Sequence, residues 1–123
     1  MAWRCGDVVW ADLDPSAGHE QGKRRPLIVV SNDRFNSYCN LTMCIPITSA
    51  DTRDPLHIDV GRVPGEHGDD IHGYAEVEQL KSLDLEARRA VKAGSIDADG
   101  MDKILGLVLG CLIGPDMSVI SGY

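Results

Sequence analysis

Residues 27–31, Leu-Ile-Val-Val-Ser, decide the fold, because they form a continuous apolar run rich in β-branched side chains. A strand that is apolar at successive positions is typical of one buried on both faces. Such a strand needs a hydrogen-bonded strand on each side and packed side chains against both of its faces. The run therefore predicts a central strand around which the rest of the chain folds.

Further β-type segments lie on both sides of this run. Residues 6–13 read as a strand bounded by Gly6 and Asp14-Pro15, and a long polar loop, residues 14–24, follows it. Residues 41–48 predict another strand, in which Pro46 indicates an edge or a bulge. The segment 32–40 between the two is rich in turn residues. Shorter strands are expected at residues 57–60, 74–80 and 89–92, with Glu76 and Glu78 on a solvated face of the second.

One convincing helix is expected near the C-terminal end, starting at about Asp97 as the N-cap and ending at Gly114-Pro115. Gly106 and Gly110 in its middle predict a close approach of the helix to a sheet. Several short strands with long loops and one terminal helix give a mainly β domain, a small and partly open barrel, over residues 1–123. The apolar positions at helical spacing are Met101, Ile104, Leu105, Val108, Leu109, Leu112 and Ile113.

Composition excludes several classes of protein. With 123 residues and 43% hydrophobic content, the chain is long enough for one core, too short for two, and too apolar for intrinsic disorder. The formal net charge of −7 argues against a uniformly basic nucleic-acid surface. The acidic excess lies in residues 51–78, whereas residues 23–25, Lys-Arg-Arg, form a cationic cluster.

The cysteines and histidines favour neither disulfides nor a metal. No Cys-x-x-Cys pair is present, so we expect four free, buried thiols in a reducing cytoplasm. A zinc site from Cys39, Cys44, His67 and His72 matches no familiar ligand spacing, and no metal is predicted. His57, His67 and His72 are expected to be exposed. Neither a signal peptide nor a membrane span is predicted.

Several motifs along the chain resemble one family. Residues 6–15 (GDVVWADLDP), 18–22 (GHEQG) and 25–32 (RPLIVVSN) closely resemble the MazF/PemK family of toxin endoribonucleases. The runs 45–49 (IPITS) and 78–84 (EQLKSLD) continue the match in order. The resemblance covers nearly the whole chain, including the terminal helix.

This resemblance implies a homodimer of SH3-like barrels, a fold shared with CcdB-like toxins. It implies cleavage of single-stranded RNA at short sequences without a metal or other cofactor. It also implies a MazE-like antitoxin whose acidic, extended tail occupies the RNA groove. The family's working pair corresponds here to Arg25, before Pro26, and Thr48, at the end of its strand.

The chemistry of metal-free RNA cleavage suits these residues. The ribose 2′-OH attacks phosphorus and leaves a 2′,3′-cyclic phosphate and a 5′-OH, which requires a base, an acid and donors for the developing charge. Arg25 supplies a permanent cation and Thr48 a hydroxyl donor. An arginine is a poor general base, so His19 and Glu20 are the candidates for acid–base support. The predicted RNA-binding residues are Gln21, Lys23, Arg24, Asn32, Ser49, Gln79 and Lys81.

Other interpretations stay open. Without the resemblance, Arg25 is interpreted equally well as a solvated cation, and an ordinary strand-end hydroxyl is the default interpretation of Thr48. Trp3 and Trp10 suit core or dimer packing better than base stacking. A non-enzymatic, CcdB-like toxin or an inactive paralogue that acts by protein binding is the alternative function. The joint presence of the Glu20-Gln21 loop, Arg25-Pro26 and Pro46-x-Thr48-Ser49 favours the nuclease.

Overall fold

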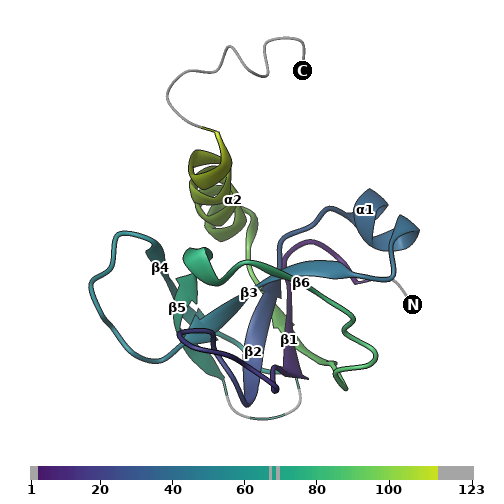
Figure 1. The fold of residues 1–123 in the computed structure, drawn as a ribbon. Coiled ribbons are helices and arrows are strands. Elements are labelled where there is room, and N and C mark those ends of the chain that lie inside the picture. The colour runs from purple at the N-terminus through teal and green to yellow at the C-terminus, as the bar shows by residue number, and fades with distance from the viewer. Residues whose placement is uncertain (1–2, 67, 69, 114–123) are drawn as a thin grey trace.

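The computed structural model describes residues 3–66, 68 and 70–113. It contains a curled antiparallel sheet with one long helix packed at one end (Figure 1). The long helix, α2, projects from one end of the sheet, and the short helix α1 lies at its side. The elements in chain order are β1 (Asp7–Asp12), β2 (Arg24–Val29), α1 (Asp33–Tyr38), β3 (Thr42–Thr48), β4 (His57–Val63), β5 (Ile71–Glu76), the 3-10 helix η1 (Val77–Gln79), β6 (Lys81–Leu83), β7 (Val91–Ser95) and α2 (Ala98–Leu112).

The strands follow the order β4-β5-β3-β2-β1-β7, and β6 pairs with β3 beside β5. All of these pairs are antiparallel. Strands β1, β2 and β3 form the middle and are buried on both faces, so that alternate residues enter two separate cores. One core holds Val8, Ile28 and Ile45, and the other holds Val9, Leu27 and Cys44. The prediction of a central, doubly buried strand is therefore confirmed, as is a mainly β fold.

Two local predictions about the first half of the chain are wrong. The connection at residues 32–40 contains a helix, α1, because Asn32 caps it by accepting a hydrogen bond from Phe35 N at 2.8 Å. Pro46 does not lie in an outer strand, and its pairing with β2 is regular, but on its other side it falls between the residues of β3 that pair with β6 and those that pair with β5. It is buried opposite Leu27, with β2 on one side of β3 and β5 and β6 on the other.

The terminal helix begins as predicted but packs differently. The Asp97 carboxylate accepts a hydrogen bond from Gly100 N at 2.7 Å, and Met101, Ile104 and Val108 enter the first core. Gly106 and Gly110 are exposed, with open space where a side chain would lie, so they make no close approach to the sheet. The stop expected at residues 114–115 lies outside the described residues. Leu109 and Leu112 are exposed, at 53% and 70%.

The cysteines are free, but they are not all buried. Cys44 is fully buried, and burial raises the pKa of its thiol to about 12. Cys111 is exposed on α2, contrary to the prediction. Among the residues that the structure describes, no helix is long and apolar enough to cross a membrane.

Asp97→Ala is expected to lower the free energy of unfolding by about 1 kcal/mol, because it removes the acceptor for the Gly100 N–H at the start of α2. Urea denaturation followed by circular dichroism measures the change. Asp102→Ala, an exposed site inside the same helix, is the matched control. Equal stability of the two variants would contradict this role for the cap.

Candidate active site

Arg25 and Thr48 lie on neighbouring strands and on the same face of the sheet. Leu27 in β2 is opposite Pro46 in β3, and the same register continued by two residues sets Arg25 opposite Thr48. Directly opposed residues of antiparallel strands project to the same face. On the other side of β3, Thr48 is opposite Tyr74 of β5. Extended in this way, the register sets the two predicted catalytic residues on the same face, at the ends of two central strands.

Each of the two side chains keeps its useful group available. The half-buried Arg25 donates from Nε to the carbonyl of Gly22 at 3.3 Å, and among the described residues it forms no ion pair. Thr48 is 8% exposed, and its Oγ1 accepts a hydrogen bond from Ala50 N at 3.2 Å. The hydroxyl hydrogen of Thr48 can therefore be donated to a ligand. A cation and a hydroxyl donor side by side suit a phosphate.

β5 approaches Thr48 closely because residue 73 is glycine. Gly73 has a φ of 145°, a region that side chains rarely adopt, and an added Cβ would collide with the Thr48 carbonyl oxygen. A larger residue would push β5 away from the end of β3. Gly73 therefore helps to shape the face on which Arg25 and Thr48 lie.

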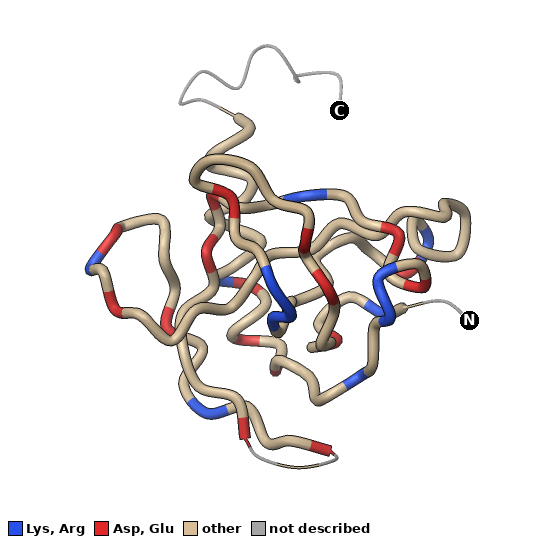
Figure 2. The backbone as a smooth tube through the Cα atoms, turned by 60° about the horizontal axis from the view of Figure 1, so that its bottom comes forward, with Lys and Arg blue, Asp and Glu red and all other residues tan. Residues whose placement is uncertain are grey.

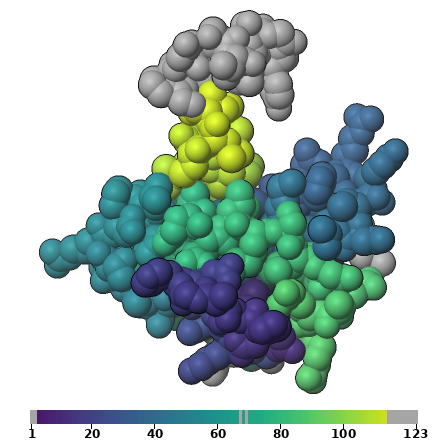
Figure 3. All heavy atoms as spheres, in the orientation of Figure 1, coloured from purple at the N-terminus to yellow at the C-terminus, as the bar shows by residue number. Residues whose placement is uncertain are grey.

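The loop 13–23 is held against η1 by two amide side chains. Gln79 donates from Nε2 to the His19 carbonyl at 3.0 Å, and its Oε1 accepts from Gln21 N at 3.3 Å. Gln21 in turn donates from Nε2 to Oε1 of Glu76 at 2.7 Å. Figure 3 shows this dark blue loop lying on the green segment that follows β5. Gln79, predicted to bind RNA, thus uses both ends of its amide to hold the loop.

Glu76 is buried beneath this loop, and its predicted place on a solvated face is wrong. It is 6% exposed, because β5 ends at this residue and the chain turns into η1, which interrupts the alternation. His57 of β4 lies directly opposite it. No sequence signal marked either residue, since alternation along residues 74–80 indicated an ordinary half-exposed strand.

Burial raises the pKa of the Glu76 carboxyl above its usual value. The hydrogen bond from Gln21 opposes this rise, the negative charge of Glu78 adds to it, and the nearby charges of His57 and Arg25 oppose it. The net shift is upward. Arg25 and Glu76 are therefore electrostatically coupled, although they lie on different strands.

The His57 side chain is also buried, at 8% exposure, so the prediction of an exposed histidine is wrong. Its Nε2 lies 2.8 Å from Glu78 Oε2 and 3.9 Å from Glu76 Oε2, and its Nδ1 lies 3.1 Å from Thr52 Oγ1. Burial lowers the pKa of the ring, but the hydrogen bond to Glu78 and the charges of Glu78, Asp54 and Glu76 outweigh it. The pKa of His57 is raised.

Asp54, His57 and Glu78 are the one group of described residues whose ligand atoms lie close enough to hold a metal ion, within 4.8 Å of one another. Both ring nitrogens of His57 already lie within hydrogen-bond distance of Glu78 and Thr52. We therefore describe this group as a hydrogen-bonded cluster and assign no ion to it.

His19 and Glu20, the acid–base candidates, lie in the exposed part of loop 13–23. The Glu20 carboxylate accepts a hydrogen bond from Ala17 N at 3.0 Å, so it stabilises the turn in which it lies. The side chain of His19 stays exposed. A role for either residue in proton transfer remains a prediction.

Three of the predicted RNA-binding residues lie near the pair. Lys23 and Arg24 precede Arg25 and are exposed, and Ser49 follows Thr48. Arg24 is engaged elsewhere, because it donates to Asp12 Oδ1 at 2.9 Å and to the Arg89 carbonyl at 3.0 Å. Of these three side chains, those of Lys23 and Ser49 are therefore more available to a ligand than that of Arg24.

The structure does not bring Asn32 and Lys81 to the pair. Asn32 follows the opposite end of β2 and caps α1, roughly 20 Å from Arg25 along the strand direction. Lys81 in β6 lies opposite Cys44, about 13 Å along β3 from Thr48. Of the other two histidines, His72 is exposed as predicted, and His67 lies outside the described residues.

A cavity of about 250 Å³ lies beside Arg25. Arg24, Ser49, Trp10 and His72 also line it, and Trp10 is 38% exposed at this place. The cavity thus joins cationic, hydroxyl and aromatic side chains with the carboxylate of Asp70, and Thr48 does not line it. The cationic, hydroxyl and aromatic groups are those to which a phosphate and an unpaired base bind.

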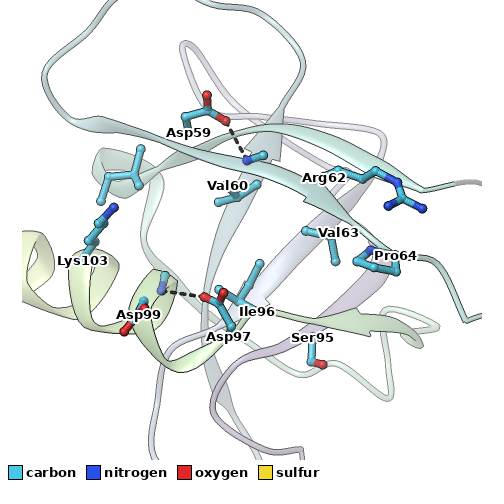
Figure 4. Close-up of a pocket in the computed structure, with 13 residues that line it drawn as sticks. Asp59, Val60, Arg62, Val63, Pro64, Ser95, Ile96, Asp97, Asp99 and Lys103 are labelled. Atoms are coloured by element: carbon cyan, nitrogen blue, oxygen red, sulfur yellow. Dashed lines mark hydrogen bonds between the residues drawn. The ribbon is translucent and has the colours of Figure 1, made fainter.

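A second cavity, of about 500 Å³, lies away from the pair, between β4 and the start of α2 (Figure 4). Asp59 and Asp97 line it, but each carboxylate accepts a backbone N–H of its own turn, from Gly61 and Gly100, at 2.7 Å. None of the predicted site residues lines this cavity. The carboxylates of Asp59 and Asp97 thus stabilise local turns.

Charges are mixed over the surface. Figure 2 shows basic and acidic segments interspersed along the backbone, without a long basic segment. Several cations are also paired with carboxylates. Such pairs are Arg4 with Asp33 at 3.3 Å, Arg24 with Asp12 at 2.9 Å and Lys92 with Asp7 at 3.5 Å.

Comparison with known proteins gives this arrangement a family. Residues 4–109 match the model of the PemK-like, MazF-like toxin of type II toxin-antitoxin systems. The chain belongs to this family. The resemblance found in the sequence motifs is therefore confirmed.

Relatives and solved structures agree with this assignment. The endoribonuclease toxin MazF of Escherichia coli is 30% identical over 80% of this chain and 84% of its own length. Endoribonuclease EndoA of Bacillus subtilis is 31% identical over 85% of this chain and 89% of its own. The crystal structure of MazF from Deinococcus radiodurans superposes with a TM-score of 0.76 at 31% identity, covering 91% of this chain and 96% of that one. The predicted MazF-like fold is thus confirmed.

Glu76→Gln is expected to gain stability relative to the natural protein as the pH rises. Because the folded pKa of Glu76 is raised, its protonated form contributes stability that is complete below the unfolded value of 4.5 and is lost as the pH rises through the folded pKa. Glutamine keeps an oxygen for Gln21 and cannot ionise.

Thermal denaturation between pH 4.5 and 8 measures this difference in melting temperature. Glu66→Gln, which changes an exposed carboxylate, is the control and is expected to show a much flatter difference. A Glu76→Gln difference that is independent of pH would show that ionisation of Glu76 costs no stability.

Proposed function

We propose that this protein is an endoribonuclease toxin that cuts single-stranded RNA, including mRNA, at short sequences without a metal ion. The observation that carries the proposal is the pairing of Leu27 with Pro46, because the same register extended by two residues sets Arg25 opposite Thr48 at the ends of β2 and β3. The family assignment and the endoribonuclease names of the E. coli and B. subtilis relatives support the same activity.

The proposed reaction forms a bond between the ribose 2′-oxygen and phosphorus and breaks the bond from phosphorus to the 5′-oxygen. The 2′-hydroxyl proton passes to a base, and the leaving 5′-oxygen receives a proton, which gives a 2′,3′-cyclic phosphate and a 5′-OH. Arg25 binds the phosphate and stabilises the extra negative charge, or donates to the leaving oxygen. Thr48 donates its free hydroxyl hydrogen to a non-bridging oxygen.

RNA recognition is assigned to the loops at this end of the sheet. Lys23, Ser49 and Gln21 surround the pair, and the cavity beside Arg25 gives an unpaired base a place against Trp10. Residues 51–78, which carry the acidic excess, include β4 and β5 and flank the end of β3 on the other side of Thr48. They limit the length of RNA that is engaged.

The partners proposed are a second copy of the chain and a MazE-like antitoxin, and the site of action is the cytoplasm. The antitoxin is supported by a solved MazE-MazF complex from D. radiodurans, whose matched chain gives a TM-score of 0.71 at 32% identity over 94% of this chain and 99% of that one. The exposed Leu109 and Leu112 on α2 provide apolar surface that association would cover.

Purified protein is expected to cut a long unstructured RNA in EDTA at discrete sites with 5′-OH ends. Arg25→Ala is expected to lower the cleavage rate at least about 100-fold, because it removes the donor for charge on the phosphate. Arg34→Ala, at an exposed position on α1, is the matched control. Gel electrophoresis with mapping of the fragment ends measures both quantities.

A folded protein that cuts no RNA would overturn the proposed activity. It would favour the alternative, a CcdB-like toxin or inactive paralogue that acts by binding a protein. Cleavage that disappears in EDTA would instead overturn metal independence alone.

His19→Ser is expected to lower the cleavage rate modestly, by roughly threefold, and to change the shape of the pH–rate profile. The reason is that the exposed His19 ring can exchange protons beside the RNA. Rates measured from pH 5.5 to 8.5 under single-turnover conditions test this. An unchanged profile in shape and height would exclude His19 from proton transfer.

A further inference from the structure

Glu76 is a buried acid that the proposed reaction does not use. It ends β5, is 6% exposed, and is surrounded by Gln21 from loop 13–23, His57 from β4, Glu78 from η1 and Arg25 from β2. Burying a carboxylate is unfavourable unless it is hydrogen-bonded and compensated. Its position under the loop next to Arg25 therefore suggests a specific role.

We propose that Glu76 determines part of the base preference of RNA cleavage, by fixing the orientation of the Gln21 side-chain amide. This inference rests on the proposed function and names one feature of its substrate. The feature is an amino-bearing base, adenine or cytosine, at one position next to the cleaved phosphate.

The orientation of the amide follows from the chemistry of the two groups. An ionised carboxylate only accepts hydrogen bonds, so the NH₂ group of Gln21 must face Glu76, and Nε2 lies 2.7 Å from Oε1. Rotation of the amide by 180° would set two oxygens against each other. The backbone of Gln21 is also held, because its N–H donates to Gln79 at 3.3 Å.

The Gln21 carbonyl oxygen is left available to a ligand. Among the described residues, every fully buried side-chain oxygen or nitrogen of a non-exposed residue is hydrogen-bonded. Within the same part of the chain Gln21 Oε1 forms no hydrogen bond, so it must reach the surface of this half-buried residue. Gln21 therefore presents an acceptor to solvent.

This acceptor lies close to the proposed phosphate site. The residue after Gln21, Gly22, accepts a hydrogen bond from Arg25 Nε at 3.3 Å. A base adjacent to a phosphate on Arg25 is thus within reach of Gln21. The exocyclic amine of adenine or cytosine can donate to the oxygen, whereas the carbonyl of uracil or guanine at the same place would oppose it.

The acceptor role of Glu76 rests on its hydrogen bond from Gln21 Nε2, and the surrounding groups act on its charge in both directions. Arg25 and His57 are the cations that favour its ionised form, while Glu78 and burial oppose ionisation. Glu78 and Asp54, in turn, favour the charged form of His57. Each element packed around Glu76 thus contributes a group that sets the charge of the carboxyl.

Glu76→Gln tests the proposal, because glutamine can either donate to or accept from Gln21 and so permits both orientations of its amide. The measurement is the ratio of cleavage rates for RNA substrates with an amino or a keto base at each position around the cut. The natural protein is expected to prefer amino bases at one position. Glu76→Gln is expected to lower this ratio roughly tenfold, whereas the control Glu66→Gln leaves it unchanged.

Gln21→Met is the second variant, and it decides the question if Glu76→Gln does not fold. It removes the amide while Glu76 stays in place, so it is expected to lower the same ratio, and adding Glu76→Gln to it should change the ratio no further.

Either of two results would overturn the inference while the nuclease function stands. One is a natural protein that cuts RNA without an amino-base preference at any position. The other is a variant that loses rate equally on all substrates and keeps its preference, since that shows a merely structural role. Absence of cleavage by the natural protein would overturn the proposed function, and this inference with it.

Discussion

The pairing of β2 with β3 is the constraint on which the site depends. Leu27 and Pro46 face each other in the middle of the sheet, and two residues further on the same register sets Arg25 opposite Thr48. A slip by one residue would turn every side chain of a strand to the other face. Because both faces of these strands are buried in separate cores, such a slip would mismatch both. Hydrophobic packing thus fixes the geometry of two polar groups at the strand ends, where a rigid support is most useful.

The loop between β1 and β2 depends on polar contacts instead. Gln79 and Glu76 hold Gln21, and the carbonyl of Gly22 meets Arg25. A buried carboxylate such as Glu76 contributes little to stability, since an apolar residue of similar size is often at least as favourable. Because an ionised carboxylate only accepts hydrogen bonds, Glu76 selects one orientation of the Gln21 amide. The loop therefore gains a defined conformation at some expense of stability.

The sequence allowed the larger elements to be predicted and left the polar network hidden. The central strand at residues 27–31 and the helix N-cap at Asp97 could be predicted because each depends on the types of neighbouring residues in the chain. Both predictions were confirmed. Pro46 was misjudged because, in a central strand, its neighbours rather than its own type decide its burial. Glu76 was placed on the solvated face because the alternation of buried and exposed side chains was assumed to continue past it. The strand instead ends at Glu76, where η1 begins, and no local sequence signal marks that end. The contacts of Glu76 with Gln21 and His57 join residues far apart in the chain, which a single sequence does not relate.

The same long-range contacts bear on how an acidic chain can hold RNA. With a formal net charge of −7 and several cations already paired with carboxylates, the surface as a whole does not attract a phosphate backbone. Binding through many phosphates depends strongly on salt, whereas binding through one phosphate and a few bases depends on geometry. A protein of this charge must therefore obtain affinity from well-placed individual contacts. The groups around Arg25, held by strand register on one side and by a buried acid on the other, are suited to such contacts.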